Sequence, residues 1–394
     1  MTPPPATDLP QLGLYVHWPF CVAKCPYCDF NSHVRDRIAQ PDWRAAYLRA
    51  LETEAARLDA HGAKRPLASI FFGGGTPSLM EPETTAAIIA AARRLFGFEA
   101  DIEITLEANP NSIEAGRFAG FRDAGVNRVS VGIQALDDAT LKFLGRAHDA
   151  AQARAAIALA LKTFPRATFD LIYARPGQTV ADWRRELDEA LAYGTSHLSL
   201  YQLTIEKGTP FYAAHRRGDF ALPDEETAAA LFEVTQQRLA DAGLAAYEIS
   251  NHARPGQESR HNLIYWRSDD YLGVGPGAHG RLTLDGATYA TLRRHKPEDW
   301  LAQAARDGMG AHEETRVTRD ERLSEMLMMG LRLTEAIPRA RFRRIAGAEP
   351  EAVLDARRLQ RLIDGGFLSL DETGLASTVE GRQRLNAVLS DLLA

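Results

Sequence analysis

An alternation of short apolar runs with longer helical segments constrains the fold of this chain more than any other feature. Six candidate strands occur between residue 12 and about residue 204, and segments with helical periodicity lie between them. The strand candidates are residues 12–18, 67–72, 102–107, 126–133, 168–173 and 197–203. Consecutive strand–helix units predict an α/β fold with parallel strands and right-handed crossovers, arranged as a barrel or as an open sheet.

The helical segments carry ordinary start signals. In residues 42–58 the side chains of Trp43, Tyr47 and Leu51 fall on one face, and Pro41 lies just before them. A second helix is predicted over residues 83–96, after Pro82. These helices would cover the predicted sheet.

Unusual residues follow the strands. Both barrels and open parallel sheets bind ligands at the carboxyl ends of their strands. The residues at these ends are a cysteine-rich loop after the first strand, Gly73 to Thr76 after the second, Glu107 at the end of the third, Gln134 after the fourth, Asp170 in the fifth, and Tyr201 and Gln202 in the sixth. The sequence therefore predicts a ligand site at one end of the sheet.

All three cysteines of the chain, Cys21, Cys25 and Cys28, lie within eight positions. Three thiolates can hold three irons of a cubane cluster and leave one iron open to another ligand. A Cys3His zinc site completed by His17 or His33 is an alternative. A redox pair of Cys25 and Cys28 is another. An odd number of cysteines disfavours a disulfide framework.

Two further stretches could contact a ligand. Gly73, Gly74, Gly75 and Thr76 allow the backbone to approach a ligand and offer N–H donors, although a tight strand-to-helix turn would explain them equally well. Glu107 could face a barrel interior, where its carboxylate could bind both hydroxyls of a ribose, and a solvated loop carboxylate before Asn109 and Pro110 is the alternative.

Composition excludes some classes of function. The chain has 394 residues, 45% of them apolar, and 46 basic against 52 acidic side chains give a net charge of −6, which disfavours nucleic acid as a partner. Residues 1–11 are Pro-rich and contain no lysine or arginine, so we expect a disordered start rather than a signal peptide. No run of about 18 apolar residues occurs, so no transmembrane segment is expected. A cytoplasmic location is predicted.

The second half of the chain is expected to extend this core. We predict a core over residues 12–210, a connecting region over 211–316 and a helical domain over 317–394. The connecting region would hold a helix at 224–242, a strand at 247–249, a loop-rich passage at 251–281, a strand at 288–292 and a helix at 297–307. The last domain would hold helices near 319–333, 350–364 and 379–393 around a hairpin of residues 367–370 and 374–377, a winged-helix-like order. Because the chain is acidic, we expect this domain to pack or to dock a partner rather than to read nucleic acid.

The C-x3-C-x2-C spacing, with Tyr27 before the last cysteine, resembles the signature of the radical S-adenosylmethionine (SAM) superfamily. Within it, the chain is similar to the branch of oxygen-independent coproporphyrinogen III oxidases and HemW-type heme chaperones. This resemblance implies a partial (β/α)6 barrel with a smaller, mainly helical C-terminal domain. It rests on residues 15–21, 28–31, 72–77, 105–110, 130–136, 144–148, 170–178 and 199–204.

The resemblance also implies roles for single residues. Cys21, Cys25 and Cys28 would ligate a 4Fe–4S cluster whose open iron chelates SAM. The residues that would contact SAM are Tyr15, Tyr27, Gly74, Gly75, Thr76 and Glu107. Gln134, Arg146 and Asp170 match positions that bind a second SAM in the decarboxylase, and they leave open whether this chain binds one or two.

Two features favour the heme-chaperone branch. The decarboxylase pattern has a further cysteine at the position of Phe30. The stretch from His261 to Trp266 reproduces an H-N-x-x-Y-W motif associated with heme, in which His261 could ligate iron and Tyr265 and Trp266 could stack on a macrocycle. A packed loop histidine is the alternative for His261. The expected partners are heme or a porphyrin, a heme-acceptor protein and an electron donor. Oxidative decarboxylation of coproporphyrinogen III is the alternative function.

The glycine-rich stretch from Gly273 to His279 lacks the context of a dinucleotide-binding loop. We expect it to form a wall beside the SAM pocket, with His279 as a secondary candidate there or for heme.

Overall fold

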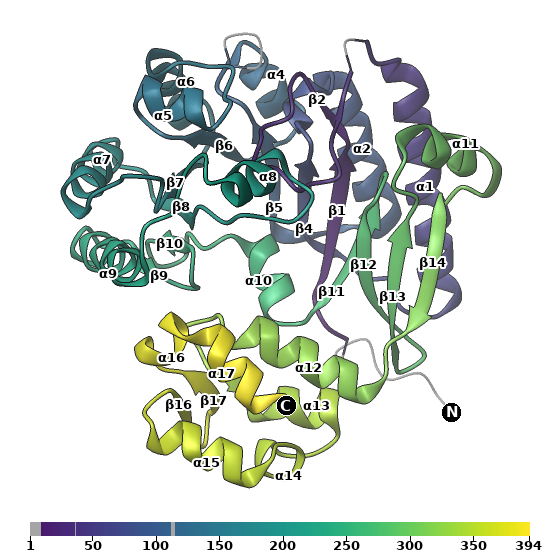
Figure 1. The fold of residues 1–394 in the computed structure, drawn as a ribbon. Helices are drawn as coiled ribbons and strands as arrows, with labels where there is room; N and C mark the ends of the chain where they lie inside the picture. The colour runs from purple at the N-terminus through teal and green to yellow at the C-terminus, as the bar shows by residue number, and fades with distance from the viewer. Residues whose placement is uncertain (1–8, 36, 112–114) are drawn as a thin grey trace.

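The computed structural model describes residues 9–35, 37–111 and 115–394. Six parallel strands adjoin one another in chain order at the centre of one large sheet (Figure 1). They are β1 (Leu12–Trp18), β4 (Leu67–Gly74), β5 (Phe98–Ala108), β6 (Arg128–Gln134), β7 (Arg166–Tyr173) and β8 (His197–Gln202). The outer two of these strands pair with other neighbours, β8 with β10 and β1 with β11, so the barrel stays open.

Later parts of the chain extend the sheet on both sides. Beyond β8 lie β10 (Asn251–Ala253) and β9 (Ala245–Ala246), both in antiparallel pairing. Beyond β1 lies β11 (Asp270–Val274), which is parallel to β1, followed by the antiparallel strands β12 (His279–Leu284), β13 (Ala287–Arg293) and β14 (Ala311–Arg316). A separate short pair, β2 (Phe20–Cys21) and β3 (His33–Val34), frames the cysteine loop.

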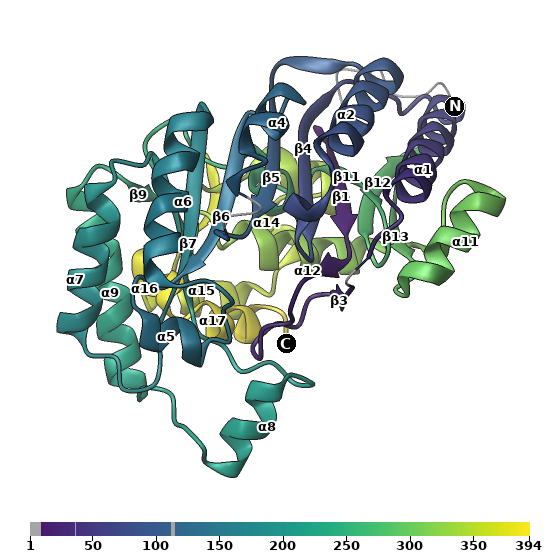
Figure 2. The same cartoon turned by 90° about the horizontal axis from the view of Figure 1, so that it is seen from above.

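Helices cover the outer face of the sheet, as the view from above shows (Figure 2). The first of them, α1 (Gln40–Ala60), buries Trp43, Tyr47 and Leu51 against the sheet, as the helical periodicity predicts. The other helices of this part are α2 (Pro82–Phe96), α4 (Phe118–Asp123), α5 (Asp138–Phe143), α6 (Ala150–Thr163), α7 (Val180–Ala192), α8 (Pro210–Arg217), α9 (Glu225–Asp241), α10 (Arg260–Trp266) and α11 (Pro297–Asp307), with a 3-10 turn at η2 (Pro77–Leu79).

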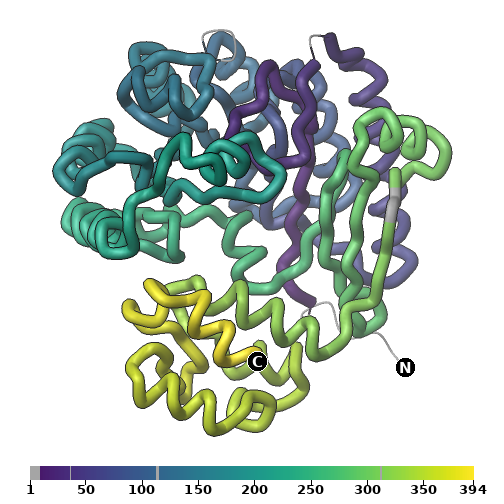
Figure 3. Tube along the Cα trace, in the orientation of Figure 1, coloured from purple at the N-terminus to yellow at the C-terminus, as the bar shows by residue number. Residues whose placement is uncertain are grey.

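The C-terminal part of the chain packs around its own core at one end of the sheet (Figure 3). Its helices are α12 (Arg319–Gly330), α13 (Arg339–Ala346), α14 (Pro350–Val353), α15 (Ala356–Asp364), α16 (Val379–Gln383) and α17 (Leu385–Leu392). Its strands are β15 (Ile337–Pro338), β17 (Gly374–Ser377) and β16 (Leu368–Leu370), in that order. Leu327, Phe342 and Leu375 lie at the centre of this second core.

The predicted fold class is confirmed, and all six predicted strands of the core are present. Two predictions for the connecting region are wrong. Residues 247–249 form bends, because the Glu248 carboxylate accepts from the Ser250 backbone N–H (2.8 Å) and from Asn251 (2.7 Å), which favours a turn. The passage 251–281 is not loop-rich, because it holds β10, α10, β11 and the start of β12. Each of these elements is too short for its hydrophobic periodicity to be recognised, and glycines interrupt the pattern.

The predicted helix over residues 350–364 needs correction, and the predicted disorder of residues 1–11 concerns residues that are mostly not described. Residues 350–364 form two helices instead of one, because Asp355 caps α15 by accepting from the backbone N–H groups of Arg357 and Arg358. The predicted disorder of residues 1–11 falls mostly on residues 1–8, which lie outside the described residues. Within the described residues, no helix combines the length and the apolar character needed to span a membrane.

Candidate functional site

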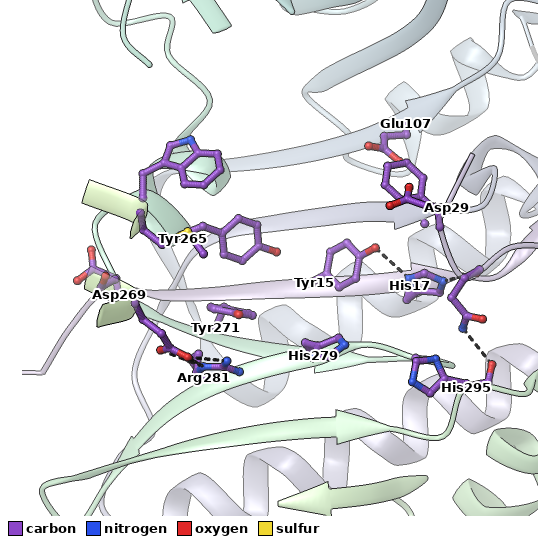
Figure 4. Close-up of a pocket in the computed structure, with 18 of the residues that line it drawn as sticks. Tyr15, His17, Asp29, Glu107, Tyr265, Asp269, Tyr271, His279, Arg281 and His295 are labelled. Carbon is purple, nitrogen blue, oxygen red and sulfur yellow. Dashed lines mark hydrogen bonds and ion pairs between the residues drawn. The ribbon is translucent and has the colours of Figure 1, made fainter. Parts of the chain in front are cut away.

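One cavity of about 740 Å³ runs along the inner face of the sheet (Figure 4). Glu107, Gly74 and His17 lie near the carboxyl ends of parallel strands, where the sequence predicts a site. The cavity continues past this region to α10 and to α12 of the C-terminal part. Its lining residues are Tyr15, His17, Asp29, Phe30, Asn31, Gly74, Glu107, Tyr265, Trp266, Ser268, Asp269, Tyr271, Gly277, His279, Arg281, His295, Arg322, Glu325 and Met329.

Strand β1 contributes two side chains to the cavity, Tyr15 and His17, because alternate residues of a strand face the same side. His17 Nε2 donates to the backbone carbonyl of Asn31 (2.9 Å), so Nδ1 accepts from the Tyr15 hydroxyl (2.9 Å). Burial lowers the pKa of His17 to about 4, which keeps this ring neutral. His17 therefore fixes the Tyr15 hydroxyl in place.

Gly74 and Glu107 meet at the carboxyl ends of β4 and β5. Gly74 has φ of 109°, and a Cβ there would lie 2.5 Å from the His17 ring, so only glycine fits. Burial and the nearby Asp170 raise the pKa of Glu107 to about 8, although a hydrogen bond from the Gly74 backbone opposes this. Glu107 is therefore mostly protonated at neutral pH.

The three thiols are free: Cys21 ends β2, and Cys25 and Cys28 lie in the loop between β2 and β3. The Thr76 hydroxyl donates to Cys21 Sγ (3.4 Å), and the Arg146 guanidinium donates to Cys25 Sγ (3.4 Å). Burial raises the pKa of Cys21. Hydrogen-bond donors that point at sulfur stabilise thiolates, which are the ligands of an iron–sulfur cluster. The reduction potential of such a cluster depends on these hydrogen bonds. These residues fit the predicted cluster.

The zinc alternative finds no support in this geometry. Both ring nitrogens of His17 are hydrogen-bonded, and His33 Nε2 is bonded to Asn31 Oδ1 (3.1 Å). Within residues 9–35, 37–111 and 115–394, no three His, Cys, Asp or Glu side chains are grouped closely enough to hold a single metal ion.

Asn31 ties the cysteine loop to two distant segments, the turn between β11 and β12 and the connection between β13 and α11. Its amide donates to the carbonyls of Pro276 and His295, both at 2.9 Å. Its own carbonyl receives the hydrogen bond from His17. Gly277 and His279 line the cavity, so the stretch 273–279 forms part of its wall, and Asn31 fixes the loop against that wall.

Several predicted SAM contacts lie beside the cavity and not in its lining. The Gly75 N–H donates to the Trp18 carbonyl (2.7 Å), and Tyr27 receives a hydrogen bond from Arg146 (3.4 Å). Arg146 also donates to Asn109 and to the Gly132 carbonyl, both at 2.7 Å.

The other two candidates for a second SAM are also held within the protein. Asp170 accepts from Ser130 (3.2 Å), and burial raises its pKa to about 6. Gln134 adopts φ of 71° at an irregularity between β6 and β7.

The stretch from His261 to Trp266 lies on α10, which is capped by Ser259. Helical spacing places His261 and Tyr265 on one face, and His261 Nε2 bonds the Tyr265 hydroxyl (2.7 Å). His261 Nδ1 bonds Ser69 Oγ (2.7 Å), and burial lowers the pKa of this histidine to about 3. Tyr265 and Trp266 line the cavity, whereas His261 lies beneath them with both nitrogens engaged.

The C-terminal part supplies Arg322, Glu325 and Met329 to the cavity from α12. Glu325 accepts from Arg281 of β12 (2.8 Å) and from Arg322 (3.2 Å). The sequence prediction missed these residues, because charged side chains on a helix are usually solvent-exposed. It also missed Tyr271, which the apolar alternation of residues 270–274 could have placed on a strand.

Comparison with known proteins agrees with this architecture. The model of the radical SAM superfamily matches residues 15–190, and that of the HemN C-terminal domain matches residues 317–384. Coproporphyrinogen III oxidase (HemN) from Escherichia coli has the same fold, with a TM-score of 0.77 and 23% identity over 98% of this chain and 91% of that one.

Relatives with higher identity extend along nearly the whole chain. Heme chaperone HemW of Haemophilus influenzae is 39% identical over 97% of each chain. HemW of Escherichia coli is 36% identical over 98% of this chain and 99% of its own. The mitochondrial radical S-adenosyl methionine domain-containing protein 1 of Mus musculus is 38% identical over 99% of this chain and 89% of its own. The chain belongs to the radical SAM superfamily and, within it, to the family of the heme chaperone HemW.

Proposed function

We propose that this chain is a heme chaperone that holds a 4Fe–4S cluster and SAM, binds heme and passes it to an acceptor protein. The observation that carries this proposal is the single cavity that joins Tyr15, Gly74 and Glu107 to Tyr265 and Trp266. Relatives named heme chaperone HemW match the whole length of the chain and support the same function.

Cys21, Cys25 and Cys28 would hold the cluster, with Thr76 and Arg146 donating to two of the sulfurs. When bound, the cluster supplies an open iron for the methionyl group of SAM and an electron. Tyr15 and the Gly74 backbone form the cavity wall at this SAM end. The Glu107 carboxylate can accept hydrogen bonds from the ribose hydroxyl groups of SAM. Gly75, Thr76 and Tyr27 lie outside the cavity lining, and we propose that they support this end of the site from beside it.

The opposite end of the cavity suits a flat macrocycle. Tyr265, Trp266 and Tyr271 provide aromatic surface, and the Tyr265 and Tyr271 rings pack edge to face with centroids 4.6 Å apart. Arg281 and Arg322 provide positive charge for carboxylates at the same end. His261 acts here by holding the Tyr265 hydroxyl, since its own nitrogens are both bonded.

Porphyrinogen decarboxylation is the competing function, because the fold is shared with coproporphyrinogen III oxidase. Phe30 stands where the decarboxylase pattern has a cysteine, and its side chain is 60% exposed at the cavity wall. Gln134, Arg146 and Asp170 are outside the cavity lining, so we propose one SAM. An electron donor and a cytoplasmic location complete the proposal.

The test uses the full chain, reconstituted anaerobically with iron and sulfide. We expect about four irons per chain, a Soret shift on titration with heme, and transfer of heme to an apo-heme protein. Weakened heme binding in Trp266→Ala, with unchanged iron content, would support the assigned end of the cavity. Conversion of coproporphyrinogen III to protoporphyrinogen IX with formation of 5′-deoxyadenosine would overturn the proposal, as would a chain that binds zinc and no iron.

A further inference from the structure

We infer that His279 of β12 is the protein ligand to the heme iron in this cavity. The inference rests on the proposed function, because it assumes that the cavity takes heme. It assigns the iron to a residue outside the H-N-x-x-Y-W stretch, and the reason lies in how the imidazoles around the cavity are engaged.

Two of the histidines near the cavity already use both ring nitrogens. His17 is bonded to Tyr15 and to the Asn31 carbonyl. His261 is bonded to Ser69 and Tyr265 and is only 1% exposed. Coordination of iron by either ring would break a buried hydrogen bond and leave a polar partner unsatisfied, which is unfavourable.

His279 is in the opposite situation. It lines the cavity and is exposed, and among the described residues its imidazole makes no hydrogen bond or ion pair. Iron coordination at either nitrogen therefore displaces only solvent, and an imidazole is a common axial ligand of heme iron.

The backbone holds His279 in a fixed place. It pairs with Leu292 of β13, and its carbonyl lies against Gly273 of β11, where a Cβ would be only 2.0 Å away. His295 also lines the cavity, but it lies in the turn between β13 and α11 beside Asn31. A strand orients a ligand more firmly than a loop does, which favours His279.

The surroundings of His279 match the rest of a heme. Arg281 follows two residues later on the same face of β12, so it presents positive charge near the ring. Figure 4 shows His279 between Arg281 and His295, with Tyr15 and Tyr271 nearby. Arg281 and Arg322 share the single carboxylate of Glu325, which leaves one net positive charge for a propionate.

The experiment titrates ferric heme into the wild-type chain and the variants His279→Ala, His295→Ala and His261→Ala, and follows the Soret band and the electron paramagnetic resonance spectrum. His279→Ala removes the proposed iron ligand and should weaken heme binding by about tenfold or more, because substitution of residues that merely hydrogen-bond a metal ligand already lowers metal affinity by about that factor. The iron spin state should change as well. Added imidazole should restore the wild-type spectrum in this variant. His61→Ala, at an exposed histidine outside the cavity lining, is the matched control and should keep both the affinity and the spectrum. Loss of the wild-type spectrum in His295→Ala alone would overturn the inference.

The outcomes separate the inference from the proposed function. A His279→Ala chain with the wild-type spectrum and affinity overturns the inference alone. The inference is also overturned if the wild-type heme spectrum is lost only in His261→Ala and is restored there by imidazole. Failure of the wild-type chain to bind heme overturns the proposed function as well. Circular dichroism of each variant shows whether a loss of binding reflects unfolding, and imidazole rescue excludes that explanation directly.

Discussion

Glu107 shows how a single residue can couple ligand binding to pH. Its carboxyl lies in the cavity near Asp170, and burial raises its pKa to about 8. In the empty protein the neutral form is therefore favoured, and this group lowers stability progressively as the pH rises from its usual pKa toward 8. A ligand that donates hydrogen bonds to the carboxylate would pull the pKa down again.

We therefore predict that SAM binding to the reconstituted protein at pH 7 releases about one proton from Glu107. Affinity should rise as the pH increases to about 8 and level off above it. Calorimetry in buffers of different ionisation enthalpy measures the proton count. Glu107→Gln should abolish the release, whereas Asp29→Asn, an exposed carboxylate of the same cavity, should preserve it. Proton-neutral binding by the wild type would contradict this assignment.

Asn31 is predicted to position the cysteine loop. Asn31→Ala removes the hydrogen bonds to the Pro276 and His295 carbonyls and should reduce the iron bound after reconstitution, with a loss of about 1–3 kcal/mol of stability. Asn127→Ala is the control, because Asn127 also makes two side-chain bonds, to the backbone of Ile102 and Ile104, away from the loop. Equal iron content in the two variants would contradict a positioning role for Asn31.

Among the elements, those with a clear period were predictable from the sequence. Strand β1 and helix α11 occur with the expected bounds. Strand β1 is a short apolar run buried on both faces, and α11 starts at Pro297 and buries one face that includes Trp300 and Ala304. The helix α10 was not predictable, because seven residues are too few to show a period of 3.6. This helix decides where His261 lies. Helical spacing brings His261 beneath Tyr265, to which it is hydrogen-bonded, and so keeps the His261 ring out of the cavity.

The contact between β11 and β12 depends on one glycine. A Cβ at Gly273 would lie 2.0 Å from the His279 backbone oxygen, which no side-chain movement can relieve. Gly273→Ala should therefore destabilise the protein by about 3 kcal/mol and weaken heme binding. Gly286→Asn, in the β12–β13 turn where an added side chain meets nothing, should be nearly neutral. Chemical denaturation compares the two, and similar midpoints would refute the close approach.

At the scale of the whole molecule, the C-terminal part closes one wall of the cavity. Arg322 of α12 donates to the Ser268 carbonyl (2.5 Å), and its partner Glu325 also holds Arg281. No sequence pattern within residues 319–330 reveals this, because the partners come from segments about 40 to 55 residues away. The chemistry of the cysteine loop could be inferred from residues close together in the sequence, whereas this wall forms only in the folded chain.

Glu325→Gln should loosen that wall. The substitution leaves Arg281 and Arg322 close together without a shared anion, so we expect a loss of about 1–3 kcal/mol, less than for a fully buried pair because Arg281 and Glu325 are partly exposed. Glu380→Gln, in an exposed pair with Arg384, should cost below about 0.5 kcal/mol. Thermal unfolding measures both, and equal shifts would mean that the Glu325 ion pairs do not stabilise the wall.

The open barrel has a further consequence, for solubility. An unclosed sheet presents two edges, each with unpaired backbone groups that can recruit another chain. Here one edge is β9, a strand of only two residues, and the other is β14, which carries the exposed charges Glu313, Glu314 and Arg316. Short length and charge are both features that discourage strand addition. Both edges of the open sheet are thus protected against the addition of a strand from another chain.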